Sequence, residues 1–187
     1  SLLALIVVLV TLFLSQRLYN PIKSILQKLN SLESESKHNF QNRKQEYLRT
    51  LVKGSCSFDK EPLEKNFKYY NVKLKLWEPL LLAIIKIDVF SAFCDKYNLV
   101  DRNLMKFCIM NISSELCAQH YENECIDLGE DHVMILINYS TPDCPKNNAA
   151  FMQIIHSIQD NIEKHLNISA SITVSEAFKG ISALNAA

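Results

Sequence analysis

The segment Leu80–Ile87 reads LLLAIIKI and contains one charged residue, Lys86. A continuous apolar run of this length, rich in branched side chains, is typical of a strand that is buried on both faces. Asp88 follows directly, and a short helical stretch is predicted over Phe90–Tyr97. We therefore expect Leu80–Ile87 to be the central strand of a sheet, with the rest of a domain arranged around it.

A long helix is predicted after this strand. Asp101 is a suitable N-cap, and the helix is expected to run to about His120. One row of apolar side chains repeats at helical spacing and is expected to face the core. This row consists of Leu104, Cys108, Ile112 and Leu116.

A hairpin and a final helix–strand pair complete the domain. The short apolar segments Glu124–Leu128 and Val133–Tyr139 flank the turn Gly129–His132. Apolar residues at helical spacing then predict an amphipathic helix over Phe151–Leu166. In Ile168–Val174 apolar residues alternate with Ser and Thr, which indicates a half-buried strand.

The predicted order is strand, helix, helix, strand, strand, helix, strand. This order predicts an α+β fold with the ferredoxin-like, split βαβ arrangement of an antiparallel sheet. Right-handed crossovers place the first strand beside the hairpin and the helices on one face of the sheet.

The N-terminal segment Leu2–Leu14 reads LLALIVVLVTLFL and carries no charge. We interpret it as the C-terminal part of a membrane-spanning helix that continues upstream, because a full span needs about 20 apolar residues. Arg17 and Lys23 follow, so the chain after about Gln16 is predicted to be cytoplasmic and the protein to lie in the cell membrane. A signal peptide and a buried core helix are the alternatives.

A second short helix is expected after Pro21, which can occupy the first turn of a helix. Its apolar side chains lie on one face and form a candidate relay seam, which pairs either with a second chain in a parallel homodimer or with its own domain. The seam consists of Ile22, Ile25, Leu26 and Leu29. Ser31–Asn42 is predicted to be a linker, and Arg43–Lys53 to be an amphipathic helix ended by Gly54.

Composition excludes several classes of protein. Lys and Arg total 20 and Asp and Glu total 20, so the chain lacks the basic excess of a domain that grips nucleic acid by its own surface. Hydrophobic residues make up 48%, which excludes general disorder. The six cysteines form no Cys-x-x-Cys pair and are interpreted as buried, reduced thiols.

Two corners of the predicted domain resemble the GGDEF (diguanylate cyclase) family. The family's strand-to-helix corner, Asp-x-Asp-x-Phe-Lys-x-x-Asn, is matched by Lys86-Ile87-Asp88-Val89-Phe90-Ser91-Ala92-Phe93-Cys94. The Gly-Gly-Asp-Glu-Phe hairpin is matched by Leu128-Gly129-Glu130-Asp131-His132. The resemblance covers about residues 77–178 and implies a nucleotidyl-cyclase-like fold.

Departures from the family pattern imply that this site is degenerate. Lys86 stands where the family has a metal-binding Asp, Cys94 where it has the Asn that reads guanine, and Leu128 where it has the first Gly. Asp88 and Asp131 match family carboxylates, but we interpret them as capping a helix and a turn. We expect no enzyme activity, no cofactor or metal, and no small-molecule substrate. The degenerate-site positions are Lys86, Asp88, Cys94, Leu128, Gly129, Glu130 and Asp131.

A second resemblance covers nearly the whole chain. The order of four motifs is similar to that of membrane-bound AraC-type transcriptional regulators of Gram-positive bacteria, in which an extracellular sensor precedes the membrane helix and helix-turn-helix units follow the degenerate domain. The motifs are Ser15-Gln16-Arg17-Leu18-Tyr19-Asn20-Pro21-Ile22, Leu51-Val52-Lys53-Gly54, Lys86-Ile87-Asp88 with Phe93, and Gly180-Ile181-Ser182-Ala183-Leu184-Asn185-Ala186-Ala187.

This resemblance implies a domain organisation and a function. Residues 1–16 are expected to be the truncated membrane helix, 17–76 juxtamembrane and linker helices, 77–178 the degenerate domain, and 179–187 the start of a linker to a DNA-binding domain outside this chain. The implied function is signal relay to that domain, which alone contacts DNA. The alternatives are a diguanylate cyclase-related enzyme or GTP-binding relic, and a membrane-anchored interaction module without a DNA-binding partner.

Overall fold

The computed structural model describes residues 28, 31–33, 35–54, 58–140, 144–181 and 183. The predicted membrane segment Leu2–Leu14 and the seam of Ile22, Ile25, Leu26 and Leu29 lie outside these residues. Within the described ranges, no helix is long and apolar enough to cross a membrane. The chain divides into two compact units, Ser1–Lys44 and Gln45–Ala187.

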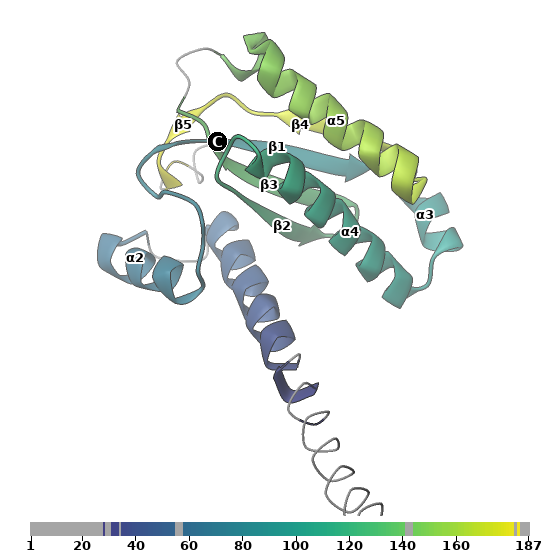
Figure 1. Cartoon of the computed structure of the whole chain (residues 1–187), viewed down its shortest axis with the longest axis horizontal. Coiled ribbons are helices and arrows are strands. Elements are labelled where there is room, and N and C mark those ends of the chain that lie inside the picture. The colour runs from purple at the N-terminus through teal and green to yellow at the C-terminus, as the bar shows by residue number, and fades with distance from the viewer. Residues whose placement is uncertain are drawn as a thin grey trace, which may run out of the picture. The chain divides into compact units, whose positions relative to one another are not determined.

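The second unit is built on one antiparallel sheet (Figure 1). The strands are β1 (Pro79–Ile87), β2 (Asn123–Gly129), β3 (His132–Asn138), β4 (Ala170–Val174) and β5 (Phe178–Lys179). The helices are α2 (Lys60–Tyr69), α3 (Phe90–Lys96), α4 (Leu99–Ala118) and α5 (Ala149–Leu166), with a short 3-10 helix at Pro145–Asn147. The strand order β2-β3-β1-β4 confirms the α+β, ferredoxin-like arrangement. The pairing of β5 with the start of β1 was not predicted.

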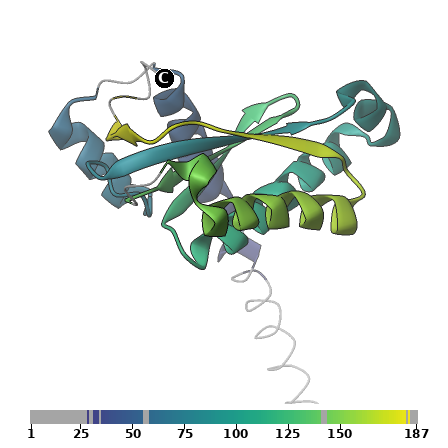
Figure 2. The ribbon, with the colours of Figure 1, turned by 90° about the horizontal axis from the view of Figure 1, so that it is seen from above.

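β1 lies inside the sheet between β3 and β4, as its sequence predicts. Its odd-numbered residues, among them Leu81 and Ile85, pack with side chains of α4 and α5, and both are fully buried. Ile109 of α4 and Ile158 of α5 belong to the same core. Figure 2 shows α4 and α5 on the same side of the sheet. The crossovers therefore place these helices as predicted.

The other face of the sheet has a second apolar core, which the sequence analysis did not predict. Leu80 of β1 packs there in a cluster that includes Leu48 and Leu51, from a helical segment over residues 45–52. Phe67 of α2 and Ile181 complete the contacts from outside the sheet. The crossover helices lie on one face, as expected, and the other face is covered by helical segments before β1, because β1 is apolar on both faces and each face needs cover.

Two details of α4 correct the sequence analysis. Its N-cap is Asn98, whose side chain accepts a hydrogen bond from the backbone N–H of Asp101, while Asp101 lies in the first turn. Leu104, at the start of the predicted core row, is 52% exposed. The buried residues are Lys106, Ile109, Ser113 and Cys117. The helix is apolar around much of its circumference, so spacing alone did not identify the buried face.

The described part of the first unit is helical at residues 28, 31–33 and 35–44, including the segment predicted to be a linker. Glu33 and Lys37, four positions apart, form an ion pair at 2.7 Å. Asn42 and His38 are in hydrogen-bond contact at the same spacing, 3.1 Å apart. Such pairs favour a helix in a segment with few apolar residues.

Free thiols occur at five positions of the described chain, and two are deeply buried. Burial raises the pKa of Cys117 to about 12 and raises the pKa of Cys125 further above its ordinary value. Both side chains are therefore unreactive, neutral parts of the core. Cys144 is exposed, so the interpretation as buried thiols does not hold for it.

Replacing one buried leucine and one exposed leucine by alanine tests this packing. We expect Leu51→Ala, at a fully buried side chain, to lower the free energy of unfolding by about 2–5 kcal/mol. Leu104→Ala, the matched control on the exposed face of α4, is expected to change it by less than about 0.5 kcal/mol. Urea denaturation of both variants measures the difference. Equal losses would contradict the assignment of residues 45–52 to the core.

Candidate functional site

The residues of the predicted degenerate site meet at one end of the sheet. Lys86, near the end of β1, lies opposite His132 of β3 and Ser171 of β4. The backbone N–H of Ile87 donates to the carbonyl oxygen of Asp131 at 2.9 Å, which holds the hairpin turn against the end of β1. The fold therefore brings together the two corners that the sequence analysis singled out.

The two carboxylates that match the cyclase family are engaged with other side chains. The Asp88 carboxylate accepts hydrogen bonds from the hydroxyls of Ser169 at 2.7 Å and Ser171 at 2.9 Å. The Asp131 carboxylate contacts the ring of His132 at 2.5 Å. Asp88 does not cap α3, whose N-cap is Val89 at φ 47°, without a side-chain cap. The predicted capping role of Asp88 is therefore wrong.

The other degenerate-site positions also have local structural roles. The Cys94 sulfur accepts a hydrogen bond from Nη1 of Arg102 at 3.2 Å. Leu128 packs against the second apolar core instead of leaving the hairpin open. At the turn, Gly129 has φ 100° and the exposed Glu130 has φ 40°. Gly129 is suited to this position because a residue with a Cβ rarely adopts such a backbone angle.

These residues do not fit the metal-bound nucleotide that the cyclase family uses. Lys86, a cation, stands where the resemblance implies a metal ligand, and the described residues contain no group of three or more His, Cys, Asp or Glu able to hold a metal. The hollow beside Asp88 and Phe93 has a volume of about 190 Å³. Small-molecule pockets usually have volumes of about 300–1,000 Å³. No metal-dependent step can be derived for this corner.

A different polar arrangement lies at the edge strand β2. The Gln45 side chain donates to the carbonyl of Cys125 at 2.8 Å and accepts from the N–H of Asp127 at 3.3 Å. Arg49 donates through Nε to the carbonyl of Asp127 at 2.8 Å. Residues 45–52 thus satisfy backbone groups that an edge strand leaves unpaired.

The Asp127 carboxylate joins three parts of the unit. It forms an ion pair with Nζ of Lys106 on α4, whose side chain is only 8% exposed. It lies 3.8 Å from Nη2 of Arg49 and accepts the backbone N–H of Gly129 at 2.9 Å. Its own side chain is 25% exposed, so water screens this cluster only partly. We call these four residues with Gln45 the Asp127 junction.

The sequence analysis missed the Asp127 junction. Its partners are far apart in the chain, since Arg49 precedes Asp127 by 78 positions. One signal was available: Asp127 interrupts the apolar run of its strand, and Lys106 interrupts an apolar helix. Charged residues at positions expected to be buried are usually paired.

Comparisons with known proteins show similarity to solved structures alone. No family model and no curated protein matches the chain. Among solved structures, the chain is similar to the diguanylate cyclase SiaD in complex with its activator SiaC from Pseudomonas aeruginosa, with 14% sequence identity and a TM-score of 0.46. The similarity covers 92% of this chain and 74% of that chain.

Loss of the Asp127 charge is expected to destabilise the unit. Asp127→Asn keeps the size of the side chain but leaves the nearly buried Lys106 ammonium without its anion. We expect the free energy of unfolding to fall by about 1–3 kcal/mol, as measured by urea denaturation. As a matched control, Asp95→Asn, at an exposed position, should change it by less than about 0.5 kcal/mol. Asp127→Asn as stable as the wild type would show that the junction contributes nothing.

Proposed function

We propose that the unit Gln45–Ala187 is a non-catalytic signal-relay module that couples the chain before Gln45 to the chain after Ile181. The proposal rests on the apolar core that the two ends of the unit share. We call residues 45–52 the entry helix and the segment ending at Ile181 the exit. Leu48 and Leu51 at the entry and Ile181 at the exit are fully buried in the same cluster. A displacement of the entry helix therefore acts on the packing around the exit.

The exit is fixed to the sheet through the backbone. The N–H of Ile181 donates to the carbonyl of Leu76 at 3.0 Å, and β5 pairs with the start of β1. Gly180, just before Ile181, has φ 71°, and a Cβ built there would lie 3.3 Å from the carbonyl oxygen of Leu76. The exit segment therefore passes close to the strand that carries the core, so shifts of the core reach it directly.

The entry is fixed by the Asp127 junction. Gln45 and Arg49 bind polar groups of β2, whereas Leu48 and Leu51 of the same helical segment are buried in the apolar core. A relay of this kind needs two arrangements that a signal can favour unequally. In the proposed second arrangement, residues 45–52 stay helical and packed on the sheet but are shifted along the β2 edge.

The finer proposal is that this module belongs to a membrane-anchored AraC-type transcriptional regulator. Its support is the order of sequence motifs, with Leu2–Leu14 as the membrane helix and the seam at Ile22–Leu29 as the dimer contact. The signal would enter from an extracellular sensor and leave towards a C-terminal helix-turn-helix domain outside this chain. Membrane location and a homodimer are parts of this proposal.

A test in cells uses the full-length protein and its own gene. Arg49→Gln removes the guanidinium from the Asp127 junction, and Arg43→Gln is a matched control at an exposed position before the unit. We expect chromatin immunoprecipitation of the wild type to enrich discrete promoters. Transcription from these promoters should change at least about fivefold in Arg49→Gln but not in Arg43→Gln.

Two results would contradict this proposal. Immunoprecipitation without any enriched promoter would exclude the regulator assignment. Unchanged transcription in Arg49→Gln, with protein levels equal by immunoblot, would exclude relay through the Asp127 junction while leaving the DNA-binding assignment open.

A calorimetric titration tests the non-catalytic part of the proposal. We expect GTP with Mg²⁺ to give no saturable heat up to about 1 mM, because Lys86 places a positive charge at the metal position and the hollow beside Asp88 is small. An active GGDEF cyclase titrated in the same buffer is the positive control. Saturable heat, or formation of a cyclic dinucleotide from GTP, would favour the enzyme alternative instead.

A further inference from the structure

A separate pocket opens between the C-terminal end of α4 and the N-terminal half of α5. Its volume is about 500 Å³, within the range of small-molecule sites. Residues of the proposed relay do not line it, and neither do those of the degenerate cyclase-like site. Its lining consists of Leu116, Gln119, His120, Tyr121, Ala150, Gln153, Ile154 and Ser157.

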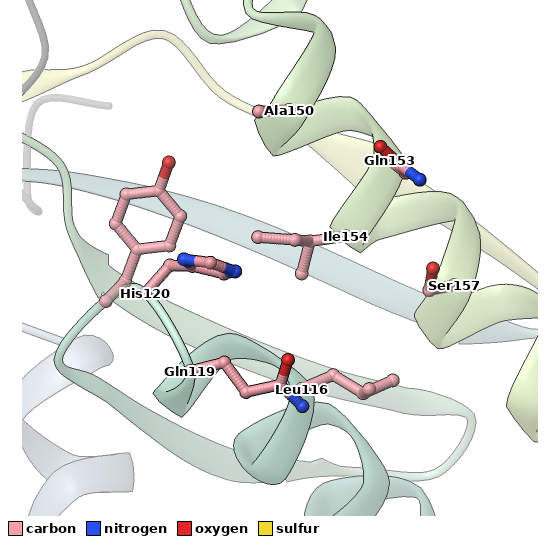
Figure 3. A pocket seen from close by; sticks show the side chains of 8 residues that line it. Leu116, Gln119, His120, Ala150, Gln153, Ile154 and Ser157 are labelled. Atoms are coloured by element: carbon pink, nitrogen blue, oxygen red, sulfur yellow. The ribbon is translucent and has the colours of Figure 1, made fainter.

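Both sides of this pocket carry polar side chains, one side at the end of α4 and the other on α5. In Figure 3, His120 and Gln119 lie at the end of α4, and Ile154 points towards His120 from α5, where the lining residues Gln153 and Ser157 also lie. Amide groups therefore stand on both walls, with an aliphatic surface between them. A flat molecule would contact apolar atoms on its faces and polar atoms at its edges.

The polar side chains of the pocket are free to bind a ligand. Within the described part of the chain, no hydrogen bond to another residue engages the side chains of Gln119, His120, Gln153 and Ser157 or the Tyr121 hydroxyl. Gln45 and Gln159, by contrast, bind backbone carbonyls. The pocket thus gathers unused donors and acceptors at one place.

The Tyr121 ring, which lines the pocket, packs against two buried aromatic rings. Its ring packs edge-on against Phe151, with centroids 5.8 Å apart, and lies 5.9 Å from the ring of Tyr139. Tyr139 and Phe151 are fully buried. Burial, and to a smaller extent the neighbouring Tyr139 and Cys117, raises the pKa of Tyr121, so its hydroxyl stays protonated and can donate.

The charge of the pocket limits the class of ligand. No Lys, Arg, Asp or Glu lines it. The adjoining hollow carries both signs, with Lys75 near Glu78 and Glu122. A phosphate or carboxylate ligand would therefore lose its hydration without gaining a counter-charge.

We propose that this pocket binds an uncharged, planar heteroaromatic molecule of the nucleoside class. The ring would stack on His120, with the Tyr121 ring, inclined at 60° to His120, against its edge. The amides of Gln119 and Gln153 would read its polar edge, as paired donors and acceptors of amide side chains read a purine. The remaining volume accommodates a sugar-sized substituent. This site is independent of the relay proposal.

Ligand-observed NMR on the full chain tests this proposal with adenosine as the probe. We expect saturable binding below about 10 mM. His120→Ala and Gln153→Ala should each weaken binding at least about fivefold, since each removes a contact from an exposed side chain without disturbing the core. His156→Ala, an exposed histidine of α5 outside the pocket, is the matched control and should not change it.

The proposed preference for an uncharged ligand is tested with adenosine 5′-monophosphate, which has the same heteroaromatic ring as adenosine and a charged phosphate. It should bind at least about fivefold more weakly than adenosine, because no Lys or Arg lines the pocket to pair with its phosphate. Tighter binding of the monophosphate would overturn the uncharged class. No saturable binding of adenosine, or binding that His120→Ala and Gln153→Ala leave unchanged, would overturn the site, and neither result bears on the relay.

Discussion

The carboxylate of Asp127 is the constraint on which the arrangement of this unit depends. It stands on the edge strand β2 and is bound at once by Lys106 of α4, by Arg49 of the entry helix and by the hairpin N–H of Gly129. These partners come from both faces of the sheet and from its turn. A nearly buried ammonium needs its anion, so the helices cannot move independently of β2 without a free-energy cost.

Through Arg49, the Asp127 junction also fixes the helical segment that covers the second face of the sheet. The entry helix uses polar side chains to cover the strand edge and leucines to fill an apolar core that also contains Ile181. At the same end of the sheet as Asp127, Lys86 and the hydroxyl-bound Asp88 lie beside the hairpin turn, in the corner whose sequence resembles a cyclase site.

Local sequence pattern predicted the sheet because β1 and β4 carry unambiguous patterns. The run LLLAIIKI requires burial on both faces, and alternation from Ile168 to Val174 places one face outward. Pattern failed on α4, where apolar residues surround the helix and Leu104 proved exposed. It also missed the Asp127 junction and the pocket at His120, because both depend on residues that only the tertiary fold brings together.

Native-state hydrogen exchange tests most directly whether the entry helix and the sheet form one cooperative unit. The account predicts that backbone amides at Leu48 and Leu51 exchange only by global unfolding, with opening free energies within about 1 kcal/mol of those at Ala83 and Ile85 in β1. Exchange at Leu48 and Leu51 through a local opening that costs about 3 kcal/mol less would contradict it, because the helix would then detach while the sheet stays folded.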